Sequence, residues 1–375
     1  MGEQVERETD EYKRMRVLYL TPWYPSERDA MAGLFVQKHV EAVRAQGVDV
    51  RVIYSLGWRD MLRQWRQLKR EWGLPDVVQL NVIQKQGLLA LWLKRRYNIP
   101  YIIIEHWSGY LPENGQFMQM IPAKRKLYAK IARQANMLLC VSNRLKDAMQ
   151  ACGVTNNDTR KVNNVVDDFF YKQTKDERPK IKDESQKSDK KILLHVSCFD
   201  ERAKNVKGLL RAAKQLADKR QDWQLVLVGT GADYKDVRTF ANSLQLPEGL
   251  LRWTRELTPQ QVSDEFDKAD VFVLPSNYEN APVVISESLA KGVPVLSTRV
   301  GGIPEMVDDC CGILVKPGHL HHTTTGSDDE LARAMEYMLN HYADYDRDII
   351  RQAGQQYSYN AVGNMLKQIY ESVRL

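Results

Sequence analysis

The chain has 375 residues, enough for two domains of ordinary size, and its 43% hydrophobic and 27% charged residues are typical of a globular protein. Its net charge of +6 is mildly basic, which allows anionic ligands or an anionic membrane surface, and we expect no nucleic-acid partner. No apolar run approaches the roughly eighteen residues of a membrane span, and the charged N-terminus is not expected to be a signal peptide. Five cysteines without a C-x-x-C pair predict reduced thiols in a cytoplasmic protein, with neither a disulfide framework nor a zinc site.

The first half of the chain alternates short apolar runs with helical patterns, which predicts parallel strands joined by helices. Strands are expected at 16–20, 48–54, 76–82, 100–105 and 137–141. Gly33, in the first loop, predicts by itself no more than a helix entry, and His39 is expected to be an ordinary helix residue. His106 directly follows a buried strand, where the ligand crevice of an open sheet lies. Its neighbours Glu105 and Trp107 are expected to point away from it if the strand alternation continues.

The segment from Trp58 to Trp72 predicts a helix with an apolar side and a basic side. Spacings of three and four residues group on the apolar side Trp58, Met61, Leu62, Trp65, Leu68 and Trp72. The segment also carries the basic residues Arg59, Arg63, Arg66, Lys69 and Arg70. Such a helix either lies in a membrane interface or packs on the N-terminal sheet with its basic side chains in water. A second basic stretch, from Arg125 to Arg133, is expected to share its positive face.

Composition changes sharply at residues 172–190, which are almost all charged or polar and predict an interdomain linker. Just before it, Asp167 and Asp168 have no third metal ligand at a supporting spacing. After it, Gly229-x-Gly231 lacks the third glycine of a dinucleotide fingerprint, so a nicotinamide-cofactor interpretation is weak. Three histidines in a polar loop also lack a partner ligand at a defined spacing: His319, His321 and His322. The C-terminal segment predicts an amphipathic helix with Val362, Met365, Leu366, Ile369 and Tyr370.

The run from Pro275 to Glu305 holds the densest cluster of residues that a fold does not need. It predicts a strand, a polar loop, a helix over 283–291, a second strand and a Gly-Gly turn that opens another helix. The free N–H groups and the dipole at the helix start suit a diphosphate. Glu279 and Glu287 frame that site, and we expect them to bind hydroxyl groups, since they would repel phosphate. Alternatively, they are a solvated loop residue and a charge on the helix surface.

The sequence ENAPVVISESLAKGVPVLSTRVGGIPE resembles the donor-binding motif of the retaining glycosyltransferases of family 4, which have the GT-B fold. The resemblance extends from Arg16 to Tyr370 and implies an α/β fold with two Rossmann-like, doubly wound domains facing a central cleft. It implies an acceptor-side domain over 15–171, completed by a C-terminal helix at about 357–375, and a donor-binding domain over 191–356. The implied reaction moves a sugar from a nucleotide sugar to an acceptor hydroxyl with retention, without a metal or another cofactor.

The resemblance also implies roles for individual residues. Glu279 would contact the donor sugar, and Glu287 would hold the ribose hydroxyls. His106 would face the sugar across the cleft, and Gly33 would approach the diphosphate. The backbone near sugar and diphosphate would be that of Asn280, Ala281, Pro282 and Val283, and the loop over 254–257 would border the base.

Two cations would neutralise the leaving diphosphate in this family, a lysine and an arginine. Lys204 occupies the lysine position, and Lys207 before Gly208 is a near match in the wrong place. Cys198 stands at the arginine position. We expect Arg202 to replace the missing charge; the alternative is an exposed loop cation.

Two other functions remain open. One is a nucleotide-sugar epimerase or a phosphorylase of the same architecture. The other is a non-catalytic subunit of a membrane-associated polysaccharide assembly, which Cys198 and the basic tryptophan helix favour. The basic faces suggest a saccharide or lipid-linked saccharide acceptor, used in polysaccharide or glycolipid synthesis by a cytoplasmic protein that is peripheral on the inner face of the membrane.

Overall fold

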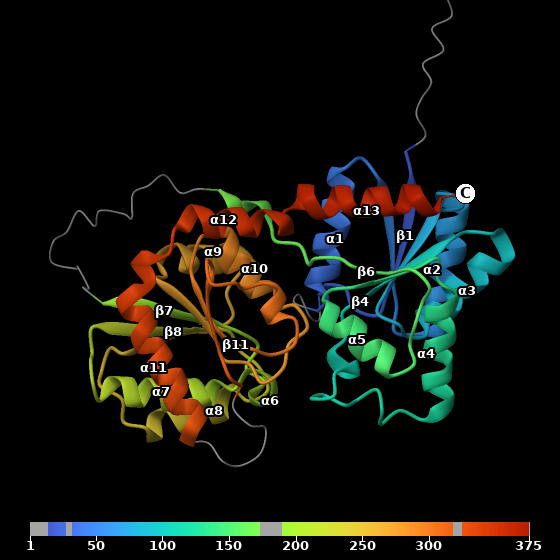
Figure 1. Cartoon of the computed structure of the whole chain (residues 1–375). Helices are drawn as coiled ribbons and strands as arrows, with labels where there is room; N and C mark the ends of the chain where they lie inside the picture. Colours follow the sequence, from blue (N-terminus) through green and yellow to red (C-terminus); the bar gives the residue numbers. More distant parts are fainter. Residues whose placement is uncertain (1–13, 28–31, 173–189, 318–324, 375) are drawn as a thin grey trace, which may run out of the picture.

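The computed structural model describes residues 14–27, 32–172, 190–317 and 325–374. The chain forms two α/β domains that lie side by side, each with a parallel six-stranded sheet between helices (Figure 1). The predicted fold class, two Rossmann-like domains, is therefore confirmed. Most of the expected linker and the loop with His319, His321 and His322 lie outside the described residues.

The N-terminal sheet has the strand order β2-β1-β3-β4-β5-β6. Its strands are β1 (Arg16–Thr21), β2 (Asp49–Tyr54), β3 (Val77–Asn81), β4 (Tyr101–Glu105), β5 (Met137–Cys140) and β6 (Thr159–Lys161). The five expected strands are confirmed, and the short β6 is an addition. Each interior strand is buried on both faces, which explains its nearly continuous apolar sequence.

The helices of this domain are α1 (Leu34–Ala45), α2 (Trp58–Glu71), α3 (Gln86–Tyr97), α4 (Pro122–Gln134) and α5 (Asn143–Ala151). The basic tryptophan segment forms α2, and the predicted division into an apolar and a basic side is only partly correct. Met61 and Trp65 are buried in the domain core, whereas Trp58 is 44% exposed. The packed alternative is therefore confirmed for the centre of the helix.

The C-terminal sheet has the strand order β12-β11-β10-β7-β8-β9. Its strands are β7 (Lys191–Val196), β8 (Trp223–Val228), β9 (Leu251–Thr254), β10 (Val271–Leu274), β11 (Val295–Thr298) and β12 (Gly312–Val315). Its helices are α6 (Glu201–Lys204), α7 (Val206–Ala217), α8 (Tyr234–Ser243), α9 (Pro259–Lys268), α10 (Val283–Ala290), α11 (Thr325–His341) and α12 (Arg347–Gly354). The strand order reverses between β7 and β10, so the loops that follow these two strands open a crevice at the carboxyl edge of the sheet.

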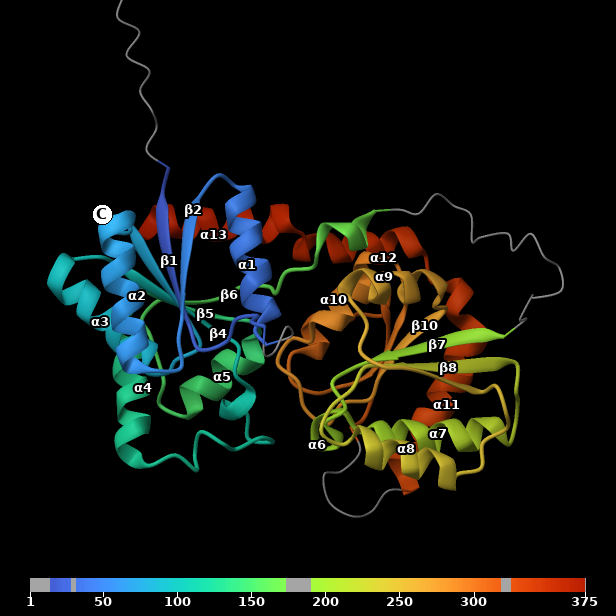
Figure 2. The same ribbon diagram turned by 180° about the vertical axis from the view of Figure 1, so that it is seen from behind.

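The last helix, α13 (Tyr359–Val373), returns to the N-terminal domain and packs along α1 (Figure 2). Its Tyr370 hydroxyl lies 2.8 Å from that of Tyr19 in β1. The close packing requires Gly363, where a Cβ atom would lie 2.4 Å from the carbonyl oxygen of Ala42. Met365 was expected on the buried side, but it is 39% exposed because it lies outside the stripe that faces α1.

The turn after β11 also differs from the prediction. Only three residues, Ile303–Glu305, form a 3-10 turn where another helix was expected. The Glu305 carboxylate instead reaches the N-terminal domain, where it accepts hydrogen bonds at 3.0 Å from the backbone N–H groups of Asn143 and Arg144 at the start of α5. Lys161 pairs with the same carboxylate at 3.0 Å, so this turn fastens the two domains together.

Candidate active site

A cavity of about 430 Å³ lies between the two domains at the crevice of the C-terminal sheet. Its N-terminal wall includes aromatic and amide side chains, namely those of Trp23, Phe35, His106, Trp107, Asn114, Gln116 and Asn164. Its C-terminal wall includes Cys198, Asp200, Lys204, Tyr278, Glu279, Asn280, Ala281 and Val283. The domains thus bring together predicted residues that are far apart in the sequence.

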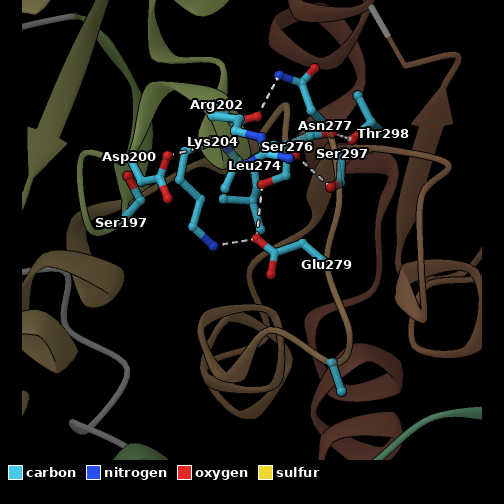
Figure 3. A network of polar contacts seen from close by, with 12 residues as sticks. Ser197, Asp200, Arg202, Lys204, Leu274, Ser276, Asn277, Glu279, Ser297 and Thr298 are labelled. Carbon is cyan, nitrogen blue, oxygen red and sulfur yellow. Dashed lines mark hydrogen bonds and ion pairs between the residues drawn. The ribbon is translucent and has the colours of Figure 1, made fainter. Parts of the chain in front are cut away.

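The centre of the C-terminal wall is an ion pair between Lys204 and Glu279 (Figure 3). Asp200 caps the short helix α6 by accepting from the Ala203 N–H, and Lys204 ends that helix. Ser276, three residues before Glu279 in the same loop after β10, donates from Oγ to Glu279 Oε1 at 2.9 Å and helps to fix the carboxylate. Burial lowers the pKa of Lys204, but the Glu279 carboxylate outweighs this effect and raises it, so the ammonium stays charged.

The Gly301-Gly302 turn supports the loop that carries Glu279. Gly301 has φ +54°, and a Cβ atom there would lie 1.6 Å from the Glu279 carbonyl oxygen. A Cβ atom on Gly302 would lie 2.0 Å from the Asn280 carbonyl oxygen and 2.6 Å from Cβ of Ser142. Only glycine allows this approach of the backbones, so the turn holds the loop from behind.

His106 follows β4 and faces the cavity from the N-terminal domain. Its ring lies 4.3 Å from that of Phe35 and 5.5 Å from that of His39, between ring centres. Burial, with His39 nearby, holds the pKa of His106 well below its usual value, so the imidazole is neutral. The His106 carbonyl accepts from the Asn280 side chain at 2.7 Å, which links the two walls.

One of the two neighbours of His106, Trp107, does not follow the strand alternation. Glu105 ends β4, and its carboxylate turns back to accept the N–H groups of His106 and Trp107, both at 3.0 Å. The chain bends there, so Trp107 lines the cavity together with His106. The prediction that Trp107 points away was therefore wrong. His39 is also more than an ordinary helix residue, since it is fully buried and its Nε2 lies 3.1 Å from the Asn163 carbonyl oxygen.

Glu287 lies one turn beyond Val283 on the same face of α10, and it is buried against the N-terminal domain. Its Oε1 lies 3.3 Å from Nζ of Lys38 in α1. Lys38 also pairs with Asp167, at 2.9 Å. Glu287 is thus neither a solvated surface charge nor part of the cavity wall, and Lys38 is a partner that the sequence did not indicate.

The other predicted residues lie around this centre. Gly33 begins α1 with φ +71°, and a Cβ atom there would lie 2.4 Å from the Trp23 backbone. The Ala281 carbonyl accepts from the Asn164 side chain at 2.8 Å. Pro282 precedes Val283, the first residue of α10, whose N–H has no partner within the helix.

The three residues considered together with Lys204 for the diphosphate site, Cys198, Arg202 and Lys207, do not all line the cavity. Cys198 lines the cavity, as expected for the site of the missing arginine. Arg202 does not line it, and its guanidinium donates to the Asn114 carbonyl of the opposite domain at 3.2 Å. Lys207 pairs with Asp236 at 2.5 Å on the outer side of α7, which agrees with its exclusion from the site.

Several residues of the cavity were not singled out in the sequence. Trp23, Asn114 and Gln116 lie in loops and Ser108 begins the three-residue 3-10 turn Ser108–Tyr110, so no regular spacing marks them. Asp200 could have been found, because an aspartate directly before a helix typically caps it. Here its carboxylate accepts the N–H of Ala203, three residues further on. Chemically, the lining combines one charged lysine, carboxylates that can accept hydrogen bonds, and a neutral aromatic and amide wall.

Comparison with protein families agrees with this geometry. A family model described as "Glycosyl transferases group 1" matches residues 176–356, and one described as "Glycosyltransferase Family 4" matches residues 9–168. The fold is similar to that of Anabaena Alr3699/HepE, solved in complex with UDP-glucose, with a TM-score of 0.72, 16% identity, and coverage of 96% of this chain and 100% of that chain.

Two curated relatives are similar in sequence. Sulfoquinovosyl transferase SQD2 of Arabidopsis thaliana is 23% identical over 259 residues, 67% of this chain and 49% of that protein. Alpha-monoglucosyldiacylglycerol synthase of Streptococcus pneumoniae is 24% identical over 257 residues, 64% of this chain and 56% of that protein. The chain thus spans about half the length of these relatives. Together, the two family matches and the fold show that the chain belongs to the group 1 glycosyltransferases of the family 4 type.

Proposed function

We propose that the protein transfers a sugar from a nucleotide sugar to an acceptor hydroxyl with retention of the anomeric configuration. The observation that carries the proposal is the Lys204–Glu279 pair at the sheet crevice, facing neutral His106 across the cavity. An ammonium group has three N–H donors, so Lys204 can bind the donor diphosphate and keep Glu279 in place. Glu279 and His106 would then hold hydroxyl groups of the donor sugar.

In the proposed reaction the bond between the anomeric carbon and the diphosphate oxygen breaks while the acceptor oxygen bonds to the same face of that carbon. The acceptor proton passes to the departing diphosphate. Lys204 stabilises the charge that develops on the leaving group, a role that needs no metal ion. Glu287 would bind the ribose, and the N–H groups at the start of α10 would meet the diphosphate.

The test is sugar transfer from UDP, GDP, ADP and CMP sugars to saccharide and glycolipid acceptors, with the product anomer read by NMR. UDP-glucose is the first donor to try, because the similar Anabaena protein was solved with it. A product of inverted configuration would contradict the mechanism. Turnover without an acceptor would favour the epimerase, use of free phosphate would favour the phosphorylase, and a lack of any nucleotide binding would favour the non-catalytic subunit.

Arg202 remains our candidate for the second cation. It lies in α6 beside Lys204, but its bond to the Asn114 carbonyl would have to open when the donor binds. We expect Arg202→Ala and Lys204→Ala both to lose turnover. Normal turnover in the Arg202 variant alone would refute this role and leave Arg202 as a contact between the domains.

We propose that the acceptor is a saccharide or a lipid-linked saccharide at an anionic membrane surface on the cytoplasmic side, and the name of the S. pneumoniae relative supports a lipid product. None of the helices in the described part of the chain has the length and hydropathy needed to cross a bilayer. The basic side chains of α2 are exposed, and two tryptophans near them, Trp58 and Trp92, are 44% and 43% exposed. Binding to anionic vesicles at low salt tests this proposal, with Trp58→Ser/Trp92→Ser as the variant expected to lose it.

A further inference from the structure

The buried lysine Lys38 connects the two domains beside Glu287, the residue that we propose to bind the ribose. Its Nζ lies 3.3 Å from Glu287 Oε1 on α10 and 2.9 Å from Asp167 Oδ2 in the segment between the domains. None of the three residues is more than 9% exposed. A charge in such a position must be paired, because burial of an isolated charge is very unfavourable.

The cluster contains more negative than positive charge. Among the described residues, Lys38 is the one basic side chain that contacts either carboxylate. On its other side, Asp167 lies 2.8 Å from the Tyr359 hydroxyl of α13, which is also 2.8 Å from Glu41 of α1. Burial raises the pKa of Glu287; the Lys38 ammonium opposes this rise, and the neighbouring Asp167 adds to it.

The pairing also fixes the direction of Glu287. Lys38 holds Oε1, and within the described parts of the chain Oε2 has no hydrogen bond or ion pair of its own. Val283, one turn earlier on the same face of α10, lines the cavity. The remaining oxygen is thus the part of Glu287 that a ligand extending from the cavity along α10 can meet.

We propose that Lys38 is a positioning residue for nucleotide binding: it keeps Glu287 ionised and oriented so that Oε2 accepts a ribose hydroxyl. The inference rests on the proposed function, because it takes the ligand of Glu287 to be the ribose of the donor. Without Lys38, Asp167 would still repel the Glu287 carboxylate and no cation would offset its burial, so Glu287 would take up a proton more readily. The other titratable groups near these carboxylates, among the described residues, are Tyr171, Tyr359, Glu41 and Asp168, and none of them can supply a positive charge.

The test compares wild type with Lys38→Met and Lys38→Gln between pH 6 and 8.5. The measurement is the calorimetric affinity for UDP, GDP and ADP and for their 2′-deoxy counterparts. We expect nearly constant affinity in the wild type. In both variants it should fall by about tenfold at pH 6 and recover toward the wild-type value at pH 8.5, since one unit of pKa shift corresponds to a factor of about ten. At pH 6, where the variants bind more weakly, their preference for ribose over 2′-deoxyribose nucleotides should also be smaller.

Three variants serve as controls. Lys38→Arg keeps the charge and should show no new pH dependence. Lys38→Met/Asp167→Asn removes the repulsion, so its affinity at pH 6 should lie above that of Lys38→Met. Lys214→Met removes a lysine that pairs with Asp218 at 2.8 Å on the surface of α7, and should bind like wild type. Lys38→Gln retains an N–H donor for the carboxylates and serves if the methionine variant unfolds.

Wild-type affinity in both neutral variants would overturn the inference. So would an equal loss at every pH with an unchanged ribose preference, because that pattern indicates a merely structural role. A wild-type protein that binds none of the nucleotides would overturn the proposed function as well, so the two failures are distinguishable.

Discussion

Glu105 is a fully buried carboxylate, and its replacement should change the pH dependence of stability. Its Oε1 accepts the N–H groups of His106 and Trp107, and its Oε2 accepts that of Ile83, all at 3.0 Å. Burial raises the pKa of Glu105 to about 7, although these N–H groups favour the ionised form. Glu105→Gln keeps the shape of the side chain and removes its ionisation.

The sign and size of the effect follow from the two pKa values. The folded pKa of about 7 lies above the ordinary value of 4.5, so between these values the folded protein binds the proton more tightly than the unfolded chain. Wild-type stability therefore contains a contribution that is complete below pH 4.5 and is lost as pH rises toward 7, by about 3 kcal/mol. The glutamine variant lacks this loss. It also leaves at least one N–H without an acceptor, which costs about 1–3 kcal/mol at every pH.

The assay is urea unfolding of wild type and Glu105→Gln at pH 5, 6, 7 and 8. The difference in unfolding free energy, wild type minus variant, should decrease by about 2.5 kcal/mol from pH 5 to pH 8, and the variant should equal or exceed wild type at pH 8. Glu71→Gln, on the exposed side of α2, is the matched control and should give a constant difference. A constant difference for Glu105→Gln too would refute the reasoning.

Three further substitutions test the site and the domain contact. Lys204→Met should lower kcat by about 10²–10³ while the protein stays folded, and a change confined to KM would contradict its role at the leaving group. Gly302→Ala places a methyl group against the Asn280 carbonyl and should lower thermal stability by about 1–3 kcal/mol, whereas Gly57→Ala, with its nearest contact at 3.9 Å, should have little effect. Glu305→Ala removes the acceptor at the start of α5 and should cost about 1–2 kcal/mol in thermal unfolding; an unchanged Tm would show that water replaces the carboxylate.

Much of the fold could be predicted because its signals are local. The interior strands are short runs of apolar residues, and burial of both faces of a parallel sheet requires such runs. Strand β6, with the sequence Thr-Arg-Lys, was missed because an edge strand is half exposed and tolerates polar residues. The prediction of a helix after Gly302 was wrong because of a contact that is distant in the sequence. The turn ends at Glu305, whose carboxylate binds the other domain.

The amphipathic pattern of α2 could not decide between a membrane and a protein core, because both accept the same apolar side chains. Packing resolved it residue by residue. Trp65 lies against Trp92 and Tyr97 of α3, at 6.5 Å between ring centres in each case, and is buried. Trp58, the first residue of α2, has no such neighbour among the described aromatic contacts and is half exposed.

Lys204 and Glu279 were singled out separately in the sequence, but their direct contact could not be predicted from it. Lys204 and Glu279 meet because β7 and β10 are neighbours in the sheet, although two strands separate them in the sequence. That adjacency follows from the chain topology and leaves no trace in either motif. Trp107 shows a related limit: strand alternation predicts a side chain only while the strand lasts, and Glu105 ends it by binding the next two N–H groups.

Lys38, the partner of Glu287, could not be predicted from the sequence. A lysine in the middle of an amphipathic helix is normally solvated, and nothing near Lys38 in the sequence suggests otherwise. Its burial becomes favourable only when α1, α10 and the interdomain segment meet, since each of the last two supplies a carboxylate. The same contact between the domains that forms the cavity therefore brings the Lys38 ammonium to Glu287. Separation of the domains would expose Lys38 and Glu287 to water and weaken their pairing, so the geometry of the proposed nucleotide site depends on the contact between the domains.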